Sequence, residues 1–240
     1  MTPEPLSEIS AAWPDRIEVR GRDLTGDLMG RLTFTEYFHL LLTGREPTDD
    51  ERFFLDVLLV SIAEHGLMPS NVAARMTLAA DPDALQGAVA AGILGAGTVI
   101  LGAAGECATL LEDADARGAE VVVRELVADG RRVPGFGHPL HKPVDPRAER
   151  LLALAAERRV AKRYVGLAGE LREAVAAVSG RQLTLNVSLP IAAVMLDLGY
   201  PSDAVKAVPI LARTASLLAH LVEERERPIG FALAARAIDE

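Results

Sequence analysis

Cysteine and aromatic residues are scarce in this chain of 240 residues. The single cysteine, Cys107, excludes an internal disulfide and fits a reducing compartment. Aromatic residues make up only 4%, whereas alanine and leucine are abundant, which favours helices over sheets. Basic residues are also few: 25 lysines and arginines against 34 aspartates and glutamates give a formal net charge of −9. This balance argues against nucleic-acid binding, and any bound anion must meet a local basic pocket.

Targeting and membrane signals are equally sparse. The opening MTPEPLSEIS lacks the basic and apolar regions of a signal peptide, so we expect a cytoplasmic protein. Only Ala84–Gly105 is charge-free over a length that could span a bilayer. Its side chains are mostly small, so insertion would be weakly favourable, and we expect a buried, tightly packed central helix instead. Small residues also let helices approach closely, which makes this segment a candidate subunit interface.

Apolar periodicity and capping residues predict an all-α chain. Residues 1–16 are expected to form an irregular arm, and only Arg16–Arg20 alternates as a strand does. The expected helices lie at residues 33–44, 47–66, 69–80, 82–105, 106–129, from 145 onward, 161–178, 186–198, 202–222 and 228–238.

The stretch Gly135–Arg147 (GFGHPLHKPVDPR) interrupts this helical chain. Its glycines permit close approach of a ligand, its prolines stiffen the loop, and Asp145 is an N-cap followed by proline. Arg147 then falls in the first helical turn, where its charge opposes the helix dipole, a placement that usually serves an anion. The loop is either an anion site that presents His138 for catalysis or a solvated basic loop with a structural histidine. The surrounding cations and histidines are Arg131, Arg132, His138, His141, Lys142 and Arg150.

This loop resembles the signature of the citrate synthase superfamily: a glycine-rich turn, a histidine, and an Asp-Pro-Arg that ends nine residues after it. VRGRDLTGDLMGRLTFTEYFHLLLTGREPTDDE is similar to the N-terminal stretch of that family, and AEHGLMPSNVAAR to its first histidine segment. LNVSLPIAAVMLDLGYP resembles the helix that usually carries Asn-Val-Asp, and LARTASLLAHLVEERERPI the C-terminal arginine helix. The resemblance covers most of residues 18–230. The short length and the loop are most similar to citryl-CoA lyases and other compact homologues.

The resemblance implies a citrate synthase-like, all-helical fold with an active site between two domains. The large domain would comprise residues 1–103 and 205–240, and the small domain residues 104–204. It also implies a homodimer whose substrate is a coenzyme A thioester, with an enolate intermediate.

The same resemblance assigns residues. His138 would face the carbonyl or hydroxyl oxygen of the substrate. Arg147 and Arg213 would hold substrate carboxylates, and His65 would hydrogen-bond the same acid. The groups near the coenzyme A phosphates would be the loop cations, chiefly Lys142, with Arg131, Arg132 and His141.

Two positions depart from the family pattern. Gly102 stands where the synthases carry a histidine that helps stabilise the enolate, and lyases can also lack it. Ser188 replaces the aspartate that moves the α-proton, and a positioned acid–base group is worth roughly 10²–10⁴-fold in rate. Another carboxylate could take the role of the missing aspartate, with Glu106 as the first candidate and Glu64 as the second. Alternatively, water protonates the enolate, and His138 and His65 assist the departure of the carbonyl product.

We therefore expect a lyase that cleaves a carboxylated 3-hydroxyacyl-CoA, such as citryl-CoA, into an acyl-CoA and an oxo acid. The alternatives are a condensing enzyme of the synthase type and a non-catalytic homologue that binds a CoA ester or a partner chain. Retention of both histidines and both arginines favours an active enzyme.

The remaining polar candidates are weaker. His39 and His220 lie in apolar helices and are expected to be core histidines. Cys107 is expected to be a small buried hydrophobe, and residues 223–227 a solvated helix face. No spacing of His, Cys, Asp or Glu predicts a metal cage, and no Ser-His-Asp motif appears, so we expect no metal.

Overall fold

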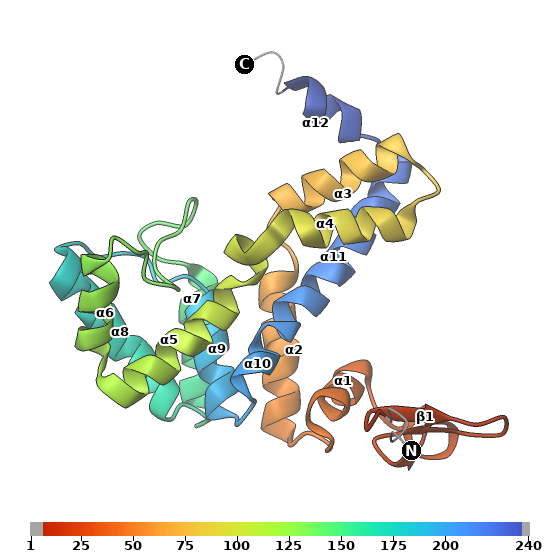
Figure 1. The fold of residues 1–240 in the computed structure, drawn as a ribbon, viewed down its shortest axis with the longest axis horizontal. Coiled ribbons are helices and arrows are strands. Elements are labelled where there is room, and N and C mark those ends of the chain that lie inside the picture. Colours follow the sequence, from red (N-terminus) through yellow and green to blue (C-terminus); the bar gives the residue numbers. More distant parts are fainter. Residues whose placement is uncertain (1–6, 237–240) are drawn as a thin grey trace, which may run out of the picture. The chain divides into compact units, whose positions relative to one another are not determined.

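The computed structural model describes residues 7–236, and its ribbon is mostly helical (Figure 1). The predicted all-α class is confirmed. The chain divides into two units, Met1–Asp56 and Val57–Glu240. The helices are α1 (Phe34–Thr43), α2 (Asp49–Ala63), α3 (Pro69–Ala80), α4 (Leu85–Leu101), α5 (Ala103–Arg117), α6 (Ala119–Ala128), α7 (Pro146–Glu157), α8 (Arg163–Ser179), α9 (Ser188–Asp197), α10 (Ser202–Val205), α11 (Ala207–Glu226) and α12 (Gly230–Arg236).

The first unit contains a small antiparallel sheet, where we expected an irregular arm up to residue 16. Strands β1 (Ser10–Ala12), β2 (Ile17–Val19) and β3 (Arg22–Asp23) pair in the order β1-β2-β3. Hydrogen bonds close the β1–β2 turn, including one of 2.8 Å from the backbone N–H of Trp13 to the carbonyl of Arg16. Local pairing therefore extends further toward the N-terminus than the alternation indicated. The part of the predicted arm at residues 1–6 lies outside the described residues.

Helix α1 begins and ends where its sequence predicted. Thr33 forms a capping box with Glu36, and Gly44 closes the helix in the left-handed conformation at φ +78°. His39 is fully buried, as expected of a core histidine. A five-residue π-helix, Leu24–Leu28, precedes α1 and supplies Leu28 to the core of this unit.

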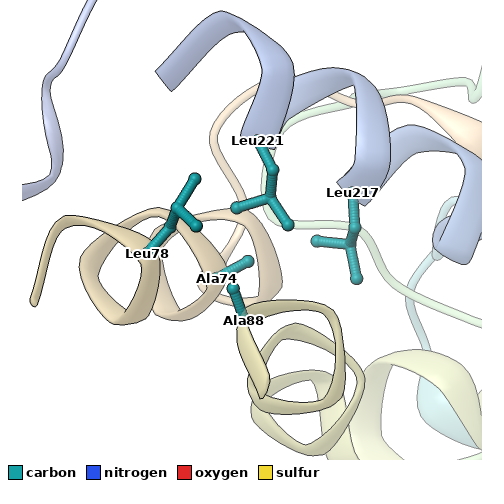
Figure 2. Close-up of a cluster of buried hydrophobic side chains, with 5 residues drawn as sticks. All are labelled: Ala74, Leu78, Ala88, Leu217 and Leu221. Atoms are coloured by element: carbon teal, nitrogen blue, oxygen red, sulfur yellow. The ribbon is translucent and has the colours of Figure 1, made fainter. Parts of the chain in front are cut away.

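In the second unit, α11 and α12 pack against α3, and α11 also packs against α4 (Figure 1). Figure 2 shows the core of this group, where side chains from α3, α4 and α11 converge. A Cβ at Gly92 of α4 would lie 2.7 Å from Leu217, so glycine is needed for this close approach. The cluster consists of Ala74, Leu78, Ala88, Leu217 and Leu221.

A second group of helices surrounds α9, whose residues Leu189–Asp197 are all buried. Helices α5, α7, α8 and α10 contact α9, and α6 packs on α5 and α8. The division into a large and a small domain stays a prediction, because packing alone does not define parts that move.

Two helix predictions were wrong. The expected helix at residues 106–129 is broken into α5 and α6 at Gly118, whose φ of +93° strongly favours glycine. Helix α4 buries only one face, and Leu94 and Val99 are 79% and 82% exposed. We expected a fully buried helix, but within one chain α4 is covered on one side only.

Two helical stretches, Leu85–Arg117 and Ser202–Glu226, are long and apolar enough to cross a bilayer by length and composition. Each also buries a face against neighbours: α5 packs on α9, and α11 packs on α3 and α4. Core helices pass the same test.

Candidate active site

Three histidines from two distant segments meet in the second unit. His65 lies in the turn between α2 and α3, whereas His138 and His141 lie in the loop before α7. The Nε2 atoms of His65 and His141 are 3.0 Å apart. The ring centres of His138 lie 5.4 Å from His65 and 4.5 Å from His141. The structure thus brings together the two predicted histidines and adds His141, which we had assigned to coenzyme A.

The loop itself fixes the tautomer of His138. Its Nδ1 accepts hydrogen bonds from the backbone N–H groups of Leu140 and His141, at 3.1 and 2.8 Å. A neutral ring with an accepting Nδ1 carries its proton on Nε2. The donor group of His138 is therefore Nε2–H, which lies 3.4 Å from Arg147 Nη2.

Backbone pairing holds this loop against the start of α9. Phe136 forms a β-bridge with Leu185, and the N–H of Asn186 donates to the carbonyl of Gly135 at 2.9 Å. A Cβ at Gly135 would lie 2.6 Å from Leu189 and 3.1 Å from Cys107, and its φ is +82°. Glycine is therefore required where the loop passes over α9. Cys107 is the buried small residue that we expected, and burial raises the pKa of its thiol.

Arg147 is oriented by a buried carboxylate. Asp145 caps α7 as predicted, and its side chain, fully buried, pairs with the Nε and Nη2 of Arg147 at 3.1 and 2.9 Å. Burial alone would raise the pKa of Asp145, but the hydrogen bonds from Arg147 and Val187 outweigh it and lower that pKa. The sequence predicted an anion near Arg147, and within the chain this anion is the carboxylate of Asp145.

Arg213 of α11 is buried and forms no ion pair with any described residue. It is 3% exposed, and its nearest hydrogen-bond acceptors are Asn71 Oδ1 at 3.3 Å and the carbonyl of Ile62 at 3.5 Å. Among residues 7–236, no group accepts a hydrogen bond from its Nε, and no carboxylate forms an ion pair with it. Burial lowers the pKa of Arg213, and the charge of Glu64 offsets this only in part, so an anion bound here would stabilise the guanidinium.

Burial and nearby positive charges lower the pKa values of His65 and His138. Burial lowers the pKa of His65, and the charges of Arg147 and His141 lower it further. Burial and His141 likewise lower the pKa of His138. At neutral pH the rings of His65 and His138 are therefore uncharged, and they lie near the guanidinium groups of Arg147 and Arg213.

Three imidazoles this close could in geometry hold a metal ion, since their ligand atoms all lie within 4.8 Å of one another. The neighbouring charges argue against it. Arg147 Nη2 lies 3.4 Å from His138 Nε2, and Arg213 acts electrostatically on His65. A divalent cation would be repelled by both guanidinium groups. The arrangement suits an anionic ligand whose carboxylates pair with the arginines and whose further oxygen lies within hydrogen-bond distance of the imidazoles.

The other predicted residues are Glu106, Arg131, Arg132, Lys142 and Ser188. Glu106 is exposed and lines a surface pocket together with Arg131 and Arg132. No hydrogen bond or ion pair among the described residues joins Glu106 to the histidines. Lys142 is exposed beside His141, and Ser188 is half-buried at the first residue of α9. Their assigned roles stay predictions.

Several polar residues behind the site were not predicted to belong to it. His220 is not in an apolar core: its Nε2 contacts Glu64 at 2.9 Å, and Arg75 donates to its Nδ1. Glu224, expected on a solvated face, is buried and pairs with Arg75 at 2.8 Å. The only signal in the sequence was the spacing of His220 from Arg213, which places both on one helix face.

The family model for the citrate synthase C-terminal domain matches residues 6–230. The chain belongs to the citrate synthase family. Its sequence is 33% identical over 202 residues to citrate synthase of Synechocystis, covering 81% of this chain and 50% of that protein. It is 30% identical over 199 residues to citrate synthase 2 of Bacillus subtilis, covering 79% and 51%. The chain thus spans about half the length of the curated relatives it matches.

Solved structures of this family include a compact neighbour. Citryl-CoA lyase from Hydrogenobacter thermophilus superposes with a TM-score of 0.84 at 30% identity, covering 92% of this chain and 87% of that one. ATP citrate lyase from Methanothrix soehngenii, in complex with citrate and coenzyme A, gives 0.81 at 21% identity, covering 94% and 39%. The second likeness shows the fold alone. The predicted superfamily and its citryl-CoA lyase-like relatives are confirmed.

Proposed function

We propose that this chain is a C–C bond lyase that cleaves a carboxylated 3-hydroxyacyl-CoA, such as citryl-CoA, into an acyl-CoA and an oxo acid. The observation that carries the proposal is the buried guanidinium of Arg213, which forms no ion pair among the described residues, beside the neutral rings of His65 and His138. The likeness to a compact citryl-CoA lyase over 92% of the chain supports the direction of the reaction.

The histidine cluster has the groups that the cleavage step needs. A base removes the proton of the C3 hydroxyl, the C2–C3 bond breaks, and its electrons move onto the thioester carbonyl as an enolate. His138 Nε2–H stabilises the oxygen as it becomes a carbonyl. Of the two Nε2 atoms that His65 and His141 hold 3.0 Å apart, one must lack a proton, and this nitrogen is the base.

The enolate must then gain a proton at C2 to give the acyl-CoA. Glu64 is a poor donor. Burial raises its pKa, but hydrogen bonds from Ser216, from the backbone of His65 and from His220 overcome this and leave the pKa lowered, so Glu64 stays ionised. Glu106 lies in the pocket of Arg131 and Arg132. We therefore favour water as the proton source, with Glu106 as the alternative.

Condensation in the synthase direction is the second candidate, because the sequence relatives named above are citrate synthases. Gly102 argues against it. A Cβ at this position would lie 2.3 Å from the carbonyl oxygen of Thr98, so the histidine of the synthases cannot stand here without a shift of the backbone.

The substrate also requires a site for coenzyme A and a second subunit. We assign the coenzyme A phosphates to Lys142, Arg131 and Arg132, and we move His141 from this set to the histidine cluster, where its Nε2 lies 3.0 Å from that of His65. We also propose a homodimer that covers the exposed Leu94 and Val99 of α4. Light scattering at micromolar concentration should give twice the mass of the chain, and a monomer would contradict this proposal.

The test of the function is a screen of 3-hydroxyacyl-CoA thioesters, including citryl-CoA, with mass detection of released acetyl-CoA or propionyl-CoA. Arg213→Gln should lower kcat/KM by about 10²-fold or more, because it removes a buried charge that pairs with the substrate carboxylate. The control is Arg225→Ala, an exposed arginine of the same helix, which should leave kcat/KM unchanged. Release of no acyl-CoA from any thioester, or normal activity of Arg213→Gln, would contradict the proposal.

A further inference from the structure

One face of α11 carries three polar residues: Arg213, Ser216 and His220. Their spacing of three and four residues places them in successive turns on the same side of the helix. The side chain of Arg213 is buried at the candidate site, whereas Ser216 and His220 both reach Glu64. Helix α11 therefore carries Arg213 and also contacts, through Ser216 and His220, the segment that carries His65.

Glu64 makes this connection through its two carboxylate oxygens. Oε1 accepts the backbone N–H groups of His65 and Gly66, at 2.8 and 2.7 Å, and so fixes the turn that presents His65. Oε2 accepts hydrogen bonds from Ser216 Oγ and from His220 Nε2, the latter at 2.9 Å. The backbone of His65 is thus tied to α11 by one carboxylate.

A buried arginine on the Nδ1 side of the His220 ring makes Nε2 the donor. Arg75 is 1% exposed and donates to His220 Nδ1 from Nε at 3.2 Å and from Nη2 at 2.7 Å. Because Nδ1 accepts, the proton of a neutral His220 is on Nε2 and points to Glu64. Glu223 and Glu224 hold Arg75 in turn, so its charge is compensated.

A second branch leads to Arg213. Asn71 Nδ2 donates to the carbonyl of Gly66 at 3.0 Å, while Asn71 Oδ1 accepts from Arg213 Nη1 at 3.3 Å. Nδ2 also lies 2.5 Å from His220 Nε2, and because both nitrogens are donors in this tautomer, this is a packing contact and not a hydrogen bond. The imidazole of His220 thus packs against the amide that holds Arg213.

We propose that His220 is a positioning residue: its Nε2–H holds Glu64, which fixes the turn of His65, and its ring packs against Asn71, which binds Arg213. Both contacts keep the site in the geometry that the substrate acid requires. The inference deepens the proposed function and rests on it for the role of His65. His220 itself does not touch the substrate.

The kinetic test compares His220→Ala with His220→Gln, using citryl-CoA as the probe. The amide nitrogen of glutamine can take the place of Nε2 as the donor to Glu64, whereas alanine cannot. We expect His220→Ala to lower kcat by at least about tenfold and His220→Gln to recover most of the loss. Ala219→Gly, an exposed neighbour, is the control for a weakened α11 and should leave kcat unchanged. Equal losses in the alanine and glutamine variants, or none in the alanine variant, would overturn the proposal.

An activity-independent readout separates this inference from the proposed function. Imidazole ¹⁵N spectra report the tautomer and surroundings of each histidine. The signals of His65 should shift in His220→Ala and return in His220→Gln. If this pattern appears while the wild-type chain releases no acyl-CoA, the proposed function fails and the positioning role stands. Unchanged His65 signals in His220→Ala would overturn the positioning role even in an active enzyme. If the alanine variant does not fold, Ser216→Ala removes the other donor to Glu64 and should shift the same signals.

Discussion

Asp145 and Arg147, two residues apart, form an ion pair through two hydrogen bonds, with Oδ1 accepting from Nε at 3.1 Å and Oδ2 from Nη2 at 2.9 Å. The same carboxylate accepts the backbone N–H groups of Arg147 and Val187, so it joins the N-termini of α7 and α9. The guanidinium is therefore oriented before any substrate binds, which lowers the entropic cost of binding an acid.

Asp145→Asn should show how much this pair contributes. Asparagine keeps the shape but loses the charge, so we expect the free energy of unfolding to fall by about 3 kcal/mol. The KM for the acid substrate should rise as Arg147 loses its orientation. Urea unfolding measures the first effect. The control is Glu149→Gln, which breaks an exposed pair with Arg172 and should cost much less. Equal costs in the two variants would contradict a structural role for the buried pair.

The lowered pKa of His138 predicts a pH dependence of stability. Burial, with the positive charges of His141 and Arg147, disfavours the protonated ring in the folded chain. Below the unfolded pKa of about 6.5, the unfolded chain binds a proton that the folded chain does not. Stability should therefore increase with pH from the lowered folded pKa up to about 6.5 and stay level above it.

The measurement is urea unfolding between about pH 5 and pH 8 for the wild type and for His138→Asn. The substitution removes the titrating group, so the slope of stability against pH should become shallower in this window. Identical slopes would show that His138 is protonated as easily in the folded chain as in the unfolded one.

Glu106 and Ser188 discriminate the two sources of the enolate proton. If water protonates the enolate, Glu106→Gln should leave kcat nearly unchanged, and Ser188→Asp could restore family-like condensation. If Glu106 is the acid, its glutamine variant should lose about 10²-fold or more in kcat with acyl-CoA affinity nearly intact. Ser188→Asp should then help little, because two carboxylates in one site raise each other's pKa. Steady-state kinetics and acyl-CoA titration distinguish the cases.

Gly102→His restores the residue of the synthases, yet we expect it to lower the melting temperature and to add no condensing activity. Its Cβ would meet the backbone of Thr98 at 2.3 Å, and a helix cannot yield there without moving the start of α5. The matched control is Gly105→Ala in the first turn of α5, where the new Cβ would meet Lys206 at an ordinary 3.7 Å. A Gly102→His protein as stable as Gly105→Ala would contradict this account.

Helix ends with strong local signals could be predicted from the sequence. Thr33 and Gly44 limit α1, and Asp145 with Pro146 begins α7, because capping acts within one turn. The break at Gly118 was missed because both flanking segments have helical periodicity, and only the positive φ reveals it. The exposed face of α4 was missed because composition does not say how many sides of a helix are covered.

The site was predicted in part for a similar reason. The rigid loop around His138 carries a recognisable motif, but the contact of His141 with His65 joins residues 76 positions apart and depends on tertiary packing. Glu64 was named only as a proton donor. Its hydrogen bonds to Ser216 and His220 bridge about 150 residues, and no local pattern announces them.

The single face of α11 that holds Arg213, Ser216 and His220 has a consequence for sequence divergence. A helix turns by about 100° per residue, so inserting or deleting one residue between Arg213 and His220 would rotate one away while the other stayed in place. Arg213 and His220 could then no longer both face the candidate site. Homologues of this chain can therefore lengthen or shorten α11 at either end. The interval from Arg213 to His220, however, should stay constant at seven positions.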